Sequence, residues 1–300
     1  MDLDSFIITV FCHMDDALRE CLKRLGGVRL RARGPHPTLS DSEVLTMEVV
    51  GHYLGFAQDK ALFNYFRTHY SHFFPALTHV HRTTFTRQAA NLWKLKERAW
   101  LYFVGQIAHD ENLAFVDSFP MPVCRFARAP ECKRLRDIAS FGRDASARQT
   151  FYGLRVHARV CWPGVITRVE IAPANVHELH LLPDLTEQTE GIVVGDRNYW
   201  APMLADELAE QGVELLAPYR KSSEDKHPGR SQVLSRIRQS IEVVFGQLCE
   251  RFSVKRMWAR DLWHLSARLL RSVLTHTFCL WLNQLHGNSL QPLRLAELVS

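Results

Sequence analysis

The chain lacks several features that would assign it to a simple class. Its seven cysteines are odd in number and scattered, and none forms a CxxC pair, which argues against a disulfide framework or a zinc site. The early apolar run at residues 6–12 follows acidic residues, whereas a secretory signal begins with basic ones. The apolar stretch 262–285 contains two arginines and two histidines, which favours a buried helix over a membrane span. We therefore expect a cytoplasmic protein with reduced thiols.

The composition is that of an ordinary globular protein with one unusually basic segment. The 300 residues are 46% hydrophobic and 10% aromatic, and the formal net charge is only +5. Residues 123–160 carry nine Lys or Arg against three Asp or Glu, so this segment alone exceeds the basic excess of the whole chain. A solvated surface loop and a DNA-phosphate contact surface both have this composition. The candidate DNA-binding residues are Arg125, Arg128, Lys133, Arg134, Arg136, Arg143 and Arg148.

The first third of the sequence predicts a helical region, residues 1–110. Apolar residues recur at helical spacing over 3–25, 44–55, 61–70 and 82–107. Ser40 and Glu43 have the spacing of a capping box, which marks a helix start.

From residue 112 onward the pattern changes to strands. Strands are expected at 113–117, 151–162, 165–175, 191–196 and 213–219, with Pro163-Gly164 as the turn of a hairpin. Helices are expected at 177–189, 201–212, 235–252 and 262–285. Three adjacent antiparallel strands followed by alternating helices and strands form the topology of the ribonuclease-H-like fold. We therefore predict an α/β protein with such a catalytic domain at 111–286 and a tail at 287–300.

Three carboxylates stand at the ends of predicted elements. Asp117 and Asp196 each follow a buried strand, and Glu242 lies within the predicted helix 235–252. Two aspartates at neighbouring strand ends and a glutamate on a later helix can hold two Mg²⁺ ions for displacement at phosphorus. A lone aspartate after a strand is also a common turn residue. Glu242 could equally form a helical ion pair with Arg238, four residues earlier.

These residues lie in segments that carry a family resemblance. The chain resembles DDE transposases of bacterial insertion sequences, most closely those of the insertion sequence 982 family, over nearly its whole length. The resemblance rests on the sequence segments at 39–51, 115–128, 150–160, 171–178, 193–199 and 238–248. On this likeness Asp117, Asp196 and Glu242 match the metal-binding acids, spaced by 79 and 46 residues. Arg238 and Glu242 match a Tyr-Arg-Glu-Lys signature whose Tyr and Lys positions hold Ser235 and Cys249 here.

The resemblance implies a mechanism, a cofactor and partners. It implies cleavage of DNA at the inverted-repeat ends, then attack of the freed 3′-OH on target DNA, with two Mg²⁺ ions for which Mn²⁺ can substitute. Arg238 would orient Glu242 or contact a phosphate. The helical region 1–110 would recognise the inverted repeats, with residues 83–95 as a candidate recognition helix, although a plain packing helix has the same periodicity. A homodimer in the synaptic complex and association with the bacterial nucleoid through DNA follow from the same likeness. Two alternatives stay open: a ribonuclease-H-like nuclease or resolvase without strand transfer, and an inactive DNA-binding descendant of a transposase.

Overall fold

The computed structural model of the chain separates into two compact units. It describes residues 1–26, 36–144, 147–219, 228–257, 259–288, 290 and 298–299. The helical unit contains the described residues within 1–107, 248–288 and 298–299, and the sheet unit contains those within 108–247 and residue 290. The division after residue 107 lies close to the expected boundary at 110. The last long helix belongs by its packing to the helical unit, whereas the sequence grouped it with the catalytic domain.

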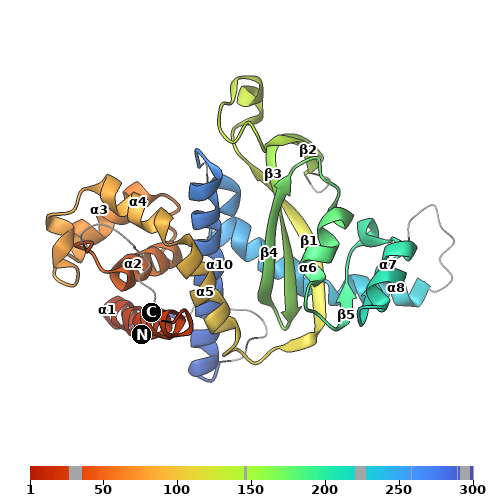
Figure 1. Cartoon of the computed structure of the whole chain (residues 1–300), viewed down its shortest axis with the longest axis horizontal. Coiled ribbons are helices and arrows are strands. Elements are labelled where there is room, and N and C mark those ends of the chain that lie inside the picture. Colours follow the sequence, from red (N-terminus) through yellow and green to blue (C-terminus); the bar gives the residue numbers. More distant parts are fainter. Residues whose placement is uncertain are drawn as a thin grey trace. The chain divides into compact units, whose positions relative to one another are not determined.

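Packed helices form the helical unit (Figure 1). Its elements are α1 (Leu3–Arg24), α2 (Asp41–Tyr53), α3 (Asp59–His69), the 3-10 turn η1 (Pro75–Thr78), α4 (Arg82–Asn91), α5 (Trp93–Val104), the 3-10 turn η6 (Val254–Arg256) and α10 (Leu262–Leu285). The helix α10 packs along α5 and is buried over most of its length. None of the described helices is long and apolar enough to cross a membrane.

Two features of the helical unit test local sequence patterns. The capping box at α2 is confirmed: the Glu43 amide donates to Ser40 Oγ at 3.1 Å, and the Ser40 amide donates to Glu43 Oε2 at 2.6 Å. The single helix expected over 82–107 is wrong. The chain breaks at Leu92, which ends α4 and begins α5 with ψ near 10° and a buried side chain. The break also interrupts the candidate recognition helix.

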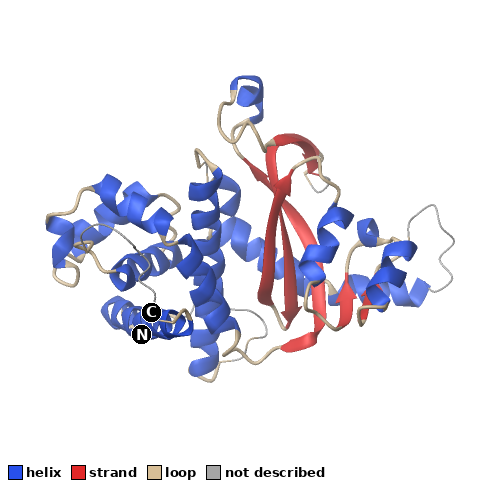
Figure 2. Ribbon diagram, in the orientation of Figure 1, coloured by secondary structure: helices blue, strands red, loops and turns tan. Residues whose placement is uncertain are grey.

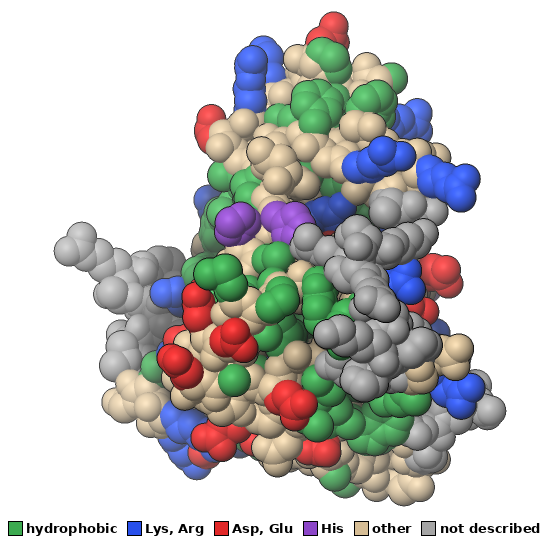
Figure 3. Space-filling model, turned by 90° about the vertical axis from the view of Figure 1, so that its right-hand side faces the viewer, with side chains coloured by type: hydrophobic (Ala, Val, Ile, Leu, Met, Phe, Trp, Pro, Cys, Tyr) green, Lys and Arg blue, Asp and Glu red, His purple; other side chains and the backbone are tan. Residues whose placement is uncertain are grey.

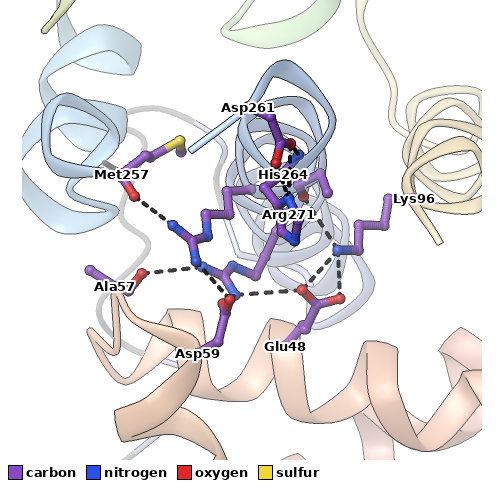
Figure 4. Close-up of polar contacts among 10 residues, drawn as sticks. Glu48, Ala57, Asp59, Lys96, Met257, Asp261, His264 and Arg271 are labelled. Atoms are coloured by element: carbon purple, nitrogen blue, oxygen red, sulfur yellow. Dashed lines mark hydrogen bonds and ion pairs between the residues drawn. The ribbon is translucent and has the colours of Figure 1, made fainter. Parts of the chain in front are cut away.

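A buried ionic cluster joins four helices of the helical unit (Figure 4). Lys96 Nζ on α5 donates to Glu48 Oε1 on α2 at 2.7 Å. Arg271 and Arg268 of α10 donate to the two carboxylate oxygens of Asp59 on α3, each at 2.8 Å. Burial raises the pKa of Asp59, but the two guanidinium groups outweigh it and hold that pKa well below its usual range. The cluster therefore anchors α10 to the other helices, in agreement with its reading as a buried helix.

The sheet unit contains one mixed six-stranded sheet with helices beside it (Figure 2). Its strands are β1 (Asp110–Pro122), β2 (Ser140–Asp144), β3 (Gln149–Trp162), β4 (Val165–Pro173), β5 (Gly191–Val194) and β6 (Val213–Leu216). Its helical elements are η2 (Phe126–Glu131), η3 (Glu178–Leu181), α6 (Leu182–Thr186), η4 (Arg197–Tyr199), α7 (Pro202–Ala209), α8 (Pro228–Ile237) and α9 (Gln239–Gly246). A π-helical turn η5 (Gln247–Arg251) follows α9.

The strand order confirms the predicted fold class. The sheet reads β2-β3-β1-β5-β6, and β4 pairs with the part of β3 that β2 leaves free. Neighbours β1, β3 and β4 are antiparallel, whereas β5 and β6 run parallel to β1. The predicted hairpin at Pro163-Gly164 joins β3 to β4. Strand β2 was not predicted, and it occupies an edge of the sheet.

The core of the sheet unit lies where the parallel strands meet the helices. Val116 of β1, Val193 of β5 and Leu185 of α6 are among its buried members. On the other side of β1, α9 packs through Phe245 against Phe119, with ring centroids 4.9 Å apart. The one helix expected over 235–252 is wrong, because a bend at Arg238 separates α8 from α9 and the π-helical turn follows.

Candidate active site

The two predicted aspartates lie at the same level of the sheet. The last residue pair between β1 and β5 is Phe115 with Val194, and Asp117 and Asp196 each come two residues later. Strand β1 does not end at Asp117, as the sequence suggested, but continues to Pro122 in partnership with β3. What ends is its pairing with β5. Beyond this last pair, β1 and β5 are no longer paired with each other, and Asp117 and Asp196 both lie just past that point.

Asp117 is held by two donors in a largely buried position. Its Oδ1 accepts from the Ser118 amide at 2.8 Å, and its Oδ2 accepts from Arg238 Nη2 at 3.0 Å. The side chain is only 18% exposed. Burial, with a smaller contribution from the nearby carboxylates Asp196 and Glu178, raises the pKa of Asp117 to about 6 despite the Arg238 guanidinium and the Ser118 amide. The folded protein therefore resists ionisation of this carboxyl group unless another cation compensates it.

Asp196 begins a tight turn after β5. Its Oδ1 accepts from the Asn198 amide at 2.7 Å and so caps η4. Burial raises the pKa of Asp196, and the charge of Glu178 raises it further. A Cβ on Gly195 would lie 2.6 Å from the Cβ and Cγ of Tyr199, so the turn requires glycine there. The buried Tyr199 side chain thus supports the turn that presents Asp196.

Glu178 joins the two aspartates through their neighbours, and the sequence analysis did not select it. It begins η3 after β4, and its Oε1 accepts from Ser118 Oγ at 2.6 Å. Its Oε2 accepts from Asn198 Nδ2 at 3.2 Å. Arg155 of β3 lies 3.5 Å from Oε1 and also donates to Ser118 Oγ at 3.1 Å. The sequence signal for Glu178 was its place at the end of segment 171–178, which follows the predicted hairpin and carries part of the resemblance.

Glu242 lies apart from this group. It is exposed in the first turn of α9, and the ion pair of Arg238 among the described residues is with Asp117. The Glu242 amide approaches the Arg238 carbonyl at 3.4 Å, so the two residues are one helical turn apart. Across the part of the chain that the structure describes, no three His, Cys, Asp or Glu side chains form a group that could hold a metal ion.

The basic segment divides into exposed and structural residues. The seven candidate DNA-binding residues are all exposed: Arg125, Arg128, Lys133, Arg134, Arg136, Arg143 and Arg148. The other two arginines of the segment make internal contacts. Arg155 serves the Glu178 group, and Arg159 donates to Thr167 Oγ1 and the Leu185 carbonyl, both at 2.9 Å. The exposed residues can contact phosphates, whereas Arg155 and Arg159 hold the sheet unit together.

The fold and the paired carboxylates define a class of enzyme. A ribonuclease-H-like sheet with aspartates beside adjacent parallel strands is suited to phosphoryl transfer in nucleic acids. Residues 107–261, just over half of the chain, match the family described as transposase DDE domain. The chain therefore belongs to the family of DDE transposases. Neither a curated protein nor a solved structure matches it.

Proposed function

We propose that this protein cuts DNA at the ends of an insertion sequence and joins the freed 3′-OH to target DNA. The observation that supports this most is the register of β1 and β5, which brings Asp117 and Asp196 together in a DDE family member. The sequence resemblance to the insertion sequence 982 family extends the proposal to the type of element. Recognition of inverted-repeat ends by the helical unit and a homodimer in the synaptic complex belong to the same proposal.

The chemistry of the Asp117 and Asp196 carboxylates suits divalent metal ions, as the family implies, whereas Glu242 lies apart from them in this structure. Carboxylate oxygens are the ligands that Mg²⁺ and Mn²⁺ prefer. Burial disfavours the charged forms of Asp117 and Asp196, and repulsion between the two carboxylates and from Glu178 adds to this cost. A bound cation would offset both effects. We propose two ions held by Asp117, Asp196 and Glu242. When bound, they would supply activation of the attacking oxygen and stabilisation of the leaving oxygen.

The protein's own groups prepare this site. Arg238 neutralises Asp117, and its withdrawal would free the Oδ2 atom for another cation. Because Glu242 lies one helical turn beyond Arg238, a rearrangement at the bend between α8 and α9 would move both side chains. The Ser118 and Asn198 amides hold one oxygen of each aspartate in place. The exposed arginines of the basic segment would position the DNA through its phosphates.

The substitution Glu242→Gln tests the proposal, with Glu207→Gln on the exposed face of α7 as its matched control. We expect Glu242→Gln to abolish cleavage of a labelled insertion-sequence end in Mn²⁺ while its affinity for that DNA stays unchanged. The Mn²⁺-induced rise in melting temperature should also shrink, since one ligand charge is lost. Cleavage at the wild-type rate would exclude Glu242 from the site.

The reaction products separate transposition from simple nuclease activity. A transposase given a pre-cut end and a plasmid target covalently joins the two, and a nuclease releases only shortened strands. We expect the joined product, with loss of both products in Asp117→Asn. Cleavage without any joined product would favour the nuclease or resolvase, and neither product would favour the inactive DNA-binding descendant.

A further inference from the structure

Two exposed phenylalanines stand within the basic segment of the sheet unit. Phe126 of η2 is 54% exposed and Phe141 of β2 is 52% exposed. Their ring centroids lie 6.3 Å apart in an edge-to-face arrangement. Phe141 also packs on Tyr152 of β3, with centroids 5.0 Å apart. The pair is therefore anchored to the sheet, yet about half of each side chain faces solvent, an arrangement that marks an interaction site.

Exposed arginines stand next to both phenylalanines on η2 and β2. Phe141 and Arg143 are the exposed positions of the edge strand β2, so they share one face of it. Arg125 directly precedes Phe126, and Arg128 follows within the same 3-10 helix, both exposed. The upper part of the face shown in Figure 3 carries Lys and Arg side chains together with hydrophobic ones. We call Phe126 and Phe141 with Arg125, Arg128 and Arg143 the aromatic–basic surface.

The chemistry of this surface selects its partner. A second copy of the same surface would place like charges together, which disfavours self-association. Duplex DNA would satisfy the arginines, but its base faces are covered by stacking and offer the phenyl rings nothing to contact. Unpaired DNA offers both phosphates and free base faces, and aromatic rings in a basic groove bind it by stacking.

The surface is also connected to the aspartates. Arg155 donates through Nη2 to the backbone carbonyl of Arg143, and through Nη1 to Ser118 Oγ beside Asp117. One arginine side chain therefore spans from β2 to the residue next to the first catalytic acid. DNA bound at the surface would continue toward the site where its backbone is cut.

We propose that the aromatic–basic surface binds an unpaired segment of DNA next to the cleaved end, with bases stacked on Phe126 and Phe141. This inference rests on the proposed function, because it assumes that DNA is cut at the neighbouring aspartates. The three arginines contact the phosphates of the same strand. The surface thus binds DNA ends with separated strands more tightly than it binds fully paired DNA.

The test compares a 20-nucleotide single strand with its duplex, both fluorescently labelled, on the full-length protein in chelator. Wild type is compared with Phe126→Ala/Phe141→Ala, with Phe126→Leu/Phe141→Leu, and with Met203→Ala, a control at an 81% exposed residue of α7. We expect both double variants to lose about tenfold or more in single-strand affinity, because neither alanine nor leucine can stack on a base. Duplex affinity and the salt dependence of both DNAs should not change, because the phosphate contacts remain.

A second readout detects stacking directly. A 2-aminopurine base in the single strand should be quenched on binding to wild type and Met203→Ala, and much less on binding to either double variant. Equal losses for single strand and duplex, unchanged affinity, or quenching that the variants retain would each overturn the proposal. The proposal would also be overturned if wild type sedimented with phosphatidylserine vesicles, the double alanine variant did not, and both bound the single strand equally. That result would assign the surface to membrane binding.

The two proposals can fail separately. If single-strand binding depends on Phe126 and Phe141 but the wild-type protein neither cleaves nor joins DNA, the proposal for the surface is supported and the transposase proposal is refuted. If cleavage and joining depend on Asp117 while the phenylalanines do not affect single-strand binding, the reverse holds. Thermal melts of the double variants show whether the sheet unit stays folded, and the leucine variant retains most of the apolar packing on Tyr152.

Discussion

Replacing Asp117 by asparagine should stabilise the metal-free protein while it destroys activity. Burial raises the pKa of Asp117 to about 6 in the folded state, against an ordinary value of 3.8. Between these two values the folded chain keeps a proton that the unfolded chain has released. Stability therefore falls as the pH rises through this window, and the full cost of ionisation is present above pH 6. Asparagine has the same shape and no charge to lose.

The size of the effect follows from the shift and from the contacts. A rise in pKa from 3.8 to about 6 corresponds to about 3 kcal/mol. This figure already includes the favourable Arg238 ion pair, and the side chain is mostly buried, so solvent screening is limited. Asparagine has one side-chain oxygen, so it can accept from the Ser118 amide or from Arg238 but not from both. The lost hydrogen bond reduces the expected gain in stability by about 1 kcal/mol. We expect a net gain of about 2 kcal/mol above pH 6, or about 4–8 °C in the melting temperature of the sheet unit.

Thermal melts in EDTA at pH 4 and pH 8 measure this difference. The two proteins should melt alike at pH 4, and Asp117→Asn should melt higher at pH 8. Asp206→Asn, an exposed aspartate of α7, is the matched control and should show no pH-dependent difference. With Mn²⁺ present the order should reverse, because wild type gains binding energy that the variant lacks. An Asp117→Asn variant less stable than wild type at pH 8 in EDTA would refute the reasoning.

Three further predictions follow from the contacts of other residues. Glu178→Ala should slow single-turnover end cleavage by about 10–100-fold, as loss of a supporting carboxylate does at metal sites. DNA affinity should not change, and Glu178→Gln should recover part of the rate. An unaltered rate would show that the Glu178 group is purely structural. Neutralising Arg134, Arg136 and Arg143 together should weaken end binding and reduce the log–log salt slope by about 0.9 per lost phosphate contact, and an unchanged slope would show a merely solvated surface. Lys96→Met should destabilise the helical unit by about 3 kcal/mol in urea, because it leaves a buried carboxylate with one cation fewer, and a neutral result would contradict a charged cluster.

The sequence by itself determined the features that depend on local pattern. The capping box at Ser40, the hairpin at Pro163-Gly164 and the alternation of strands and helices each follow from residues close together in the chain. So did the placement of Asp196 after a buried strand. Asp117 also follows an apolar run, but the strand end expected there was wrong, since β1 continues to Pro122. These patterns were enough to predict the α/β class and to choose the two aspartates as candidates.

Only the tertiary structure decided which side chains meet. Arg238 reaches Asp117 across 121 residues, and Glu178 reaches Ser118 across 60, and no local pattern encodes either contact. The breaks at Leu92 and Arg238 carry no proline or glycine, so the periodicity continued through them in the sequence. Strand register and burial are set by non-local packing. They left Glu242 exposed, brought Glu178 between the aspartates, and packed α10 into the helical unit.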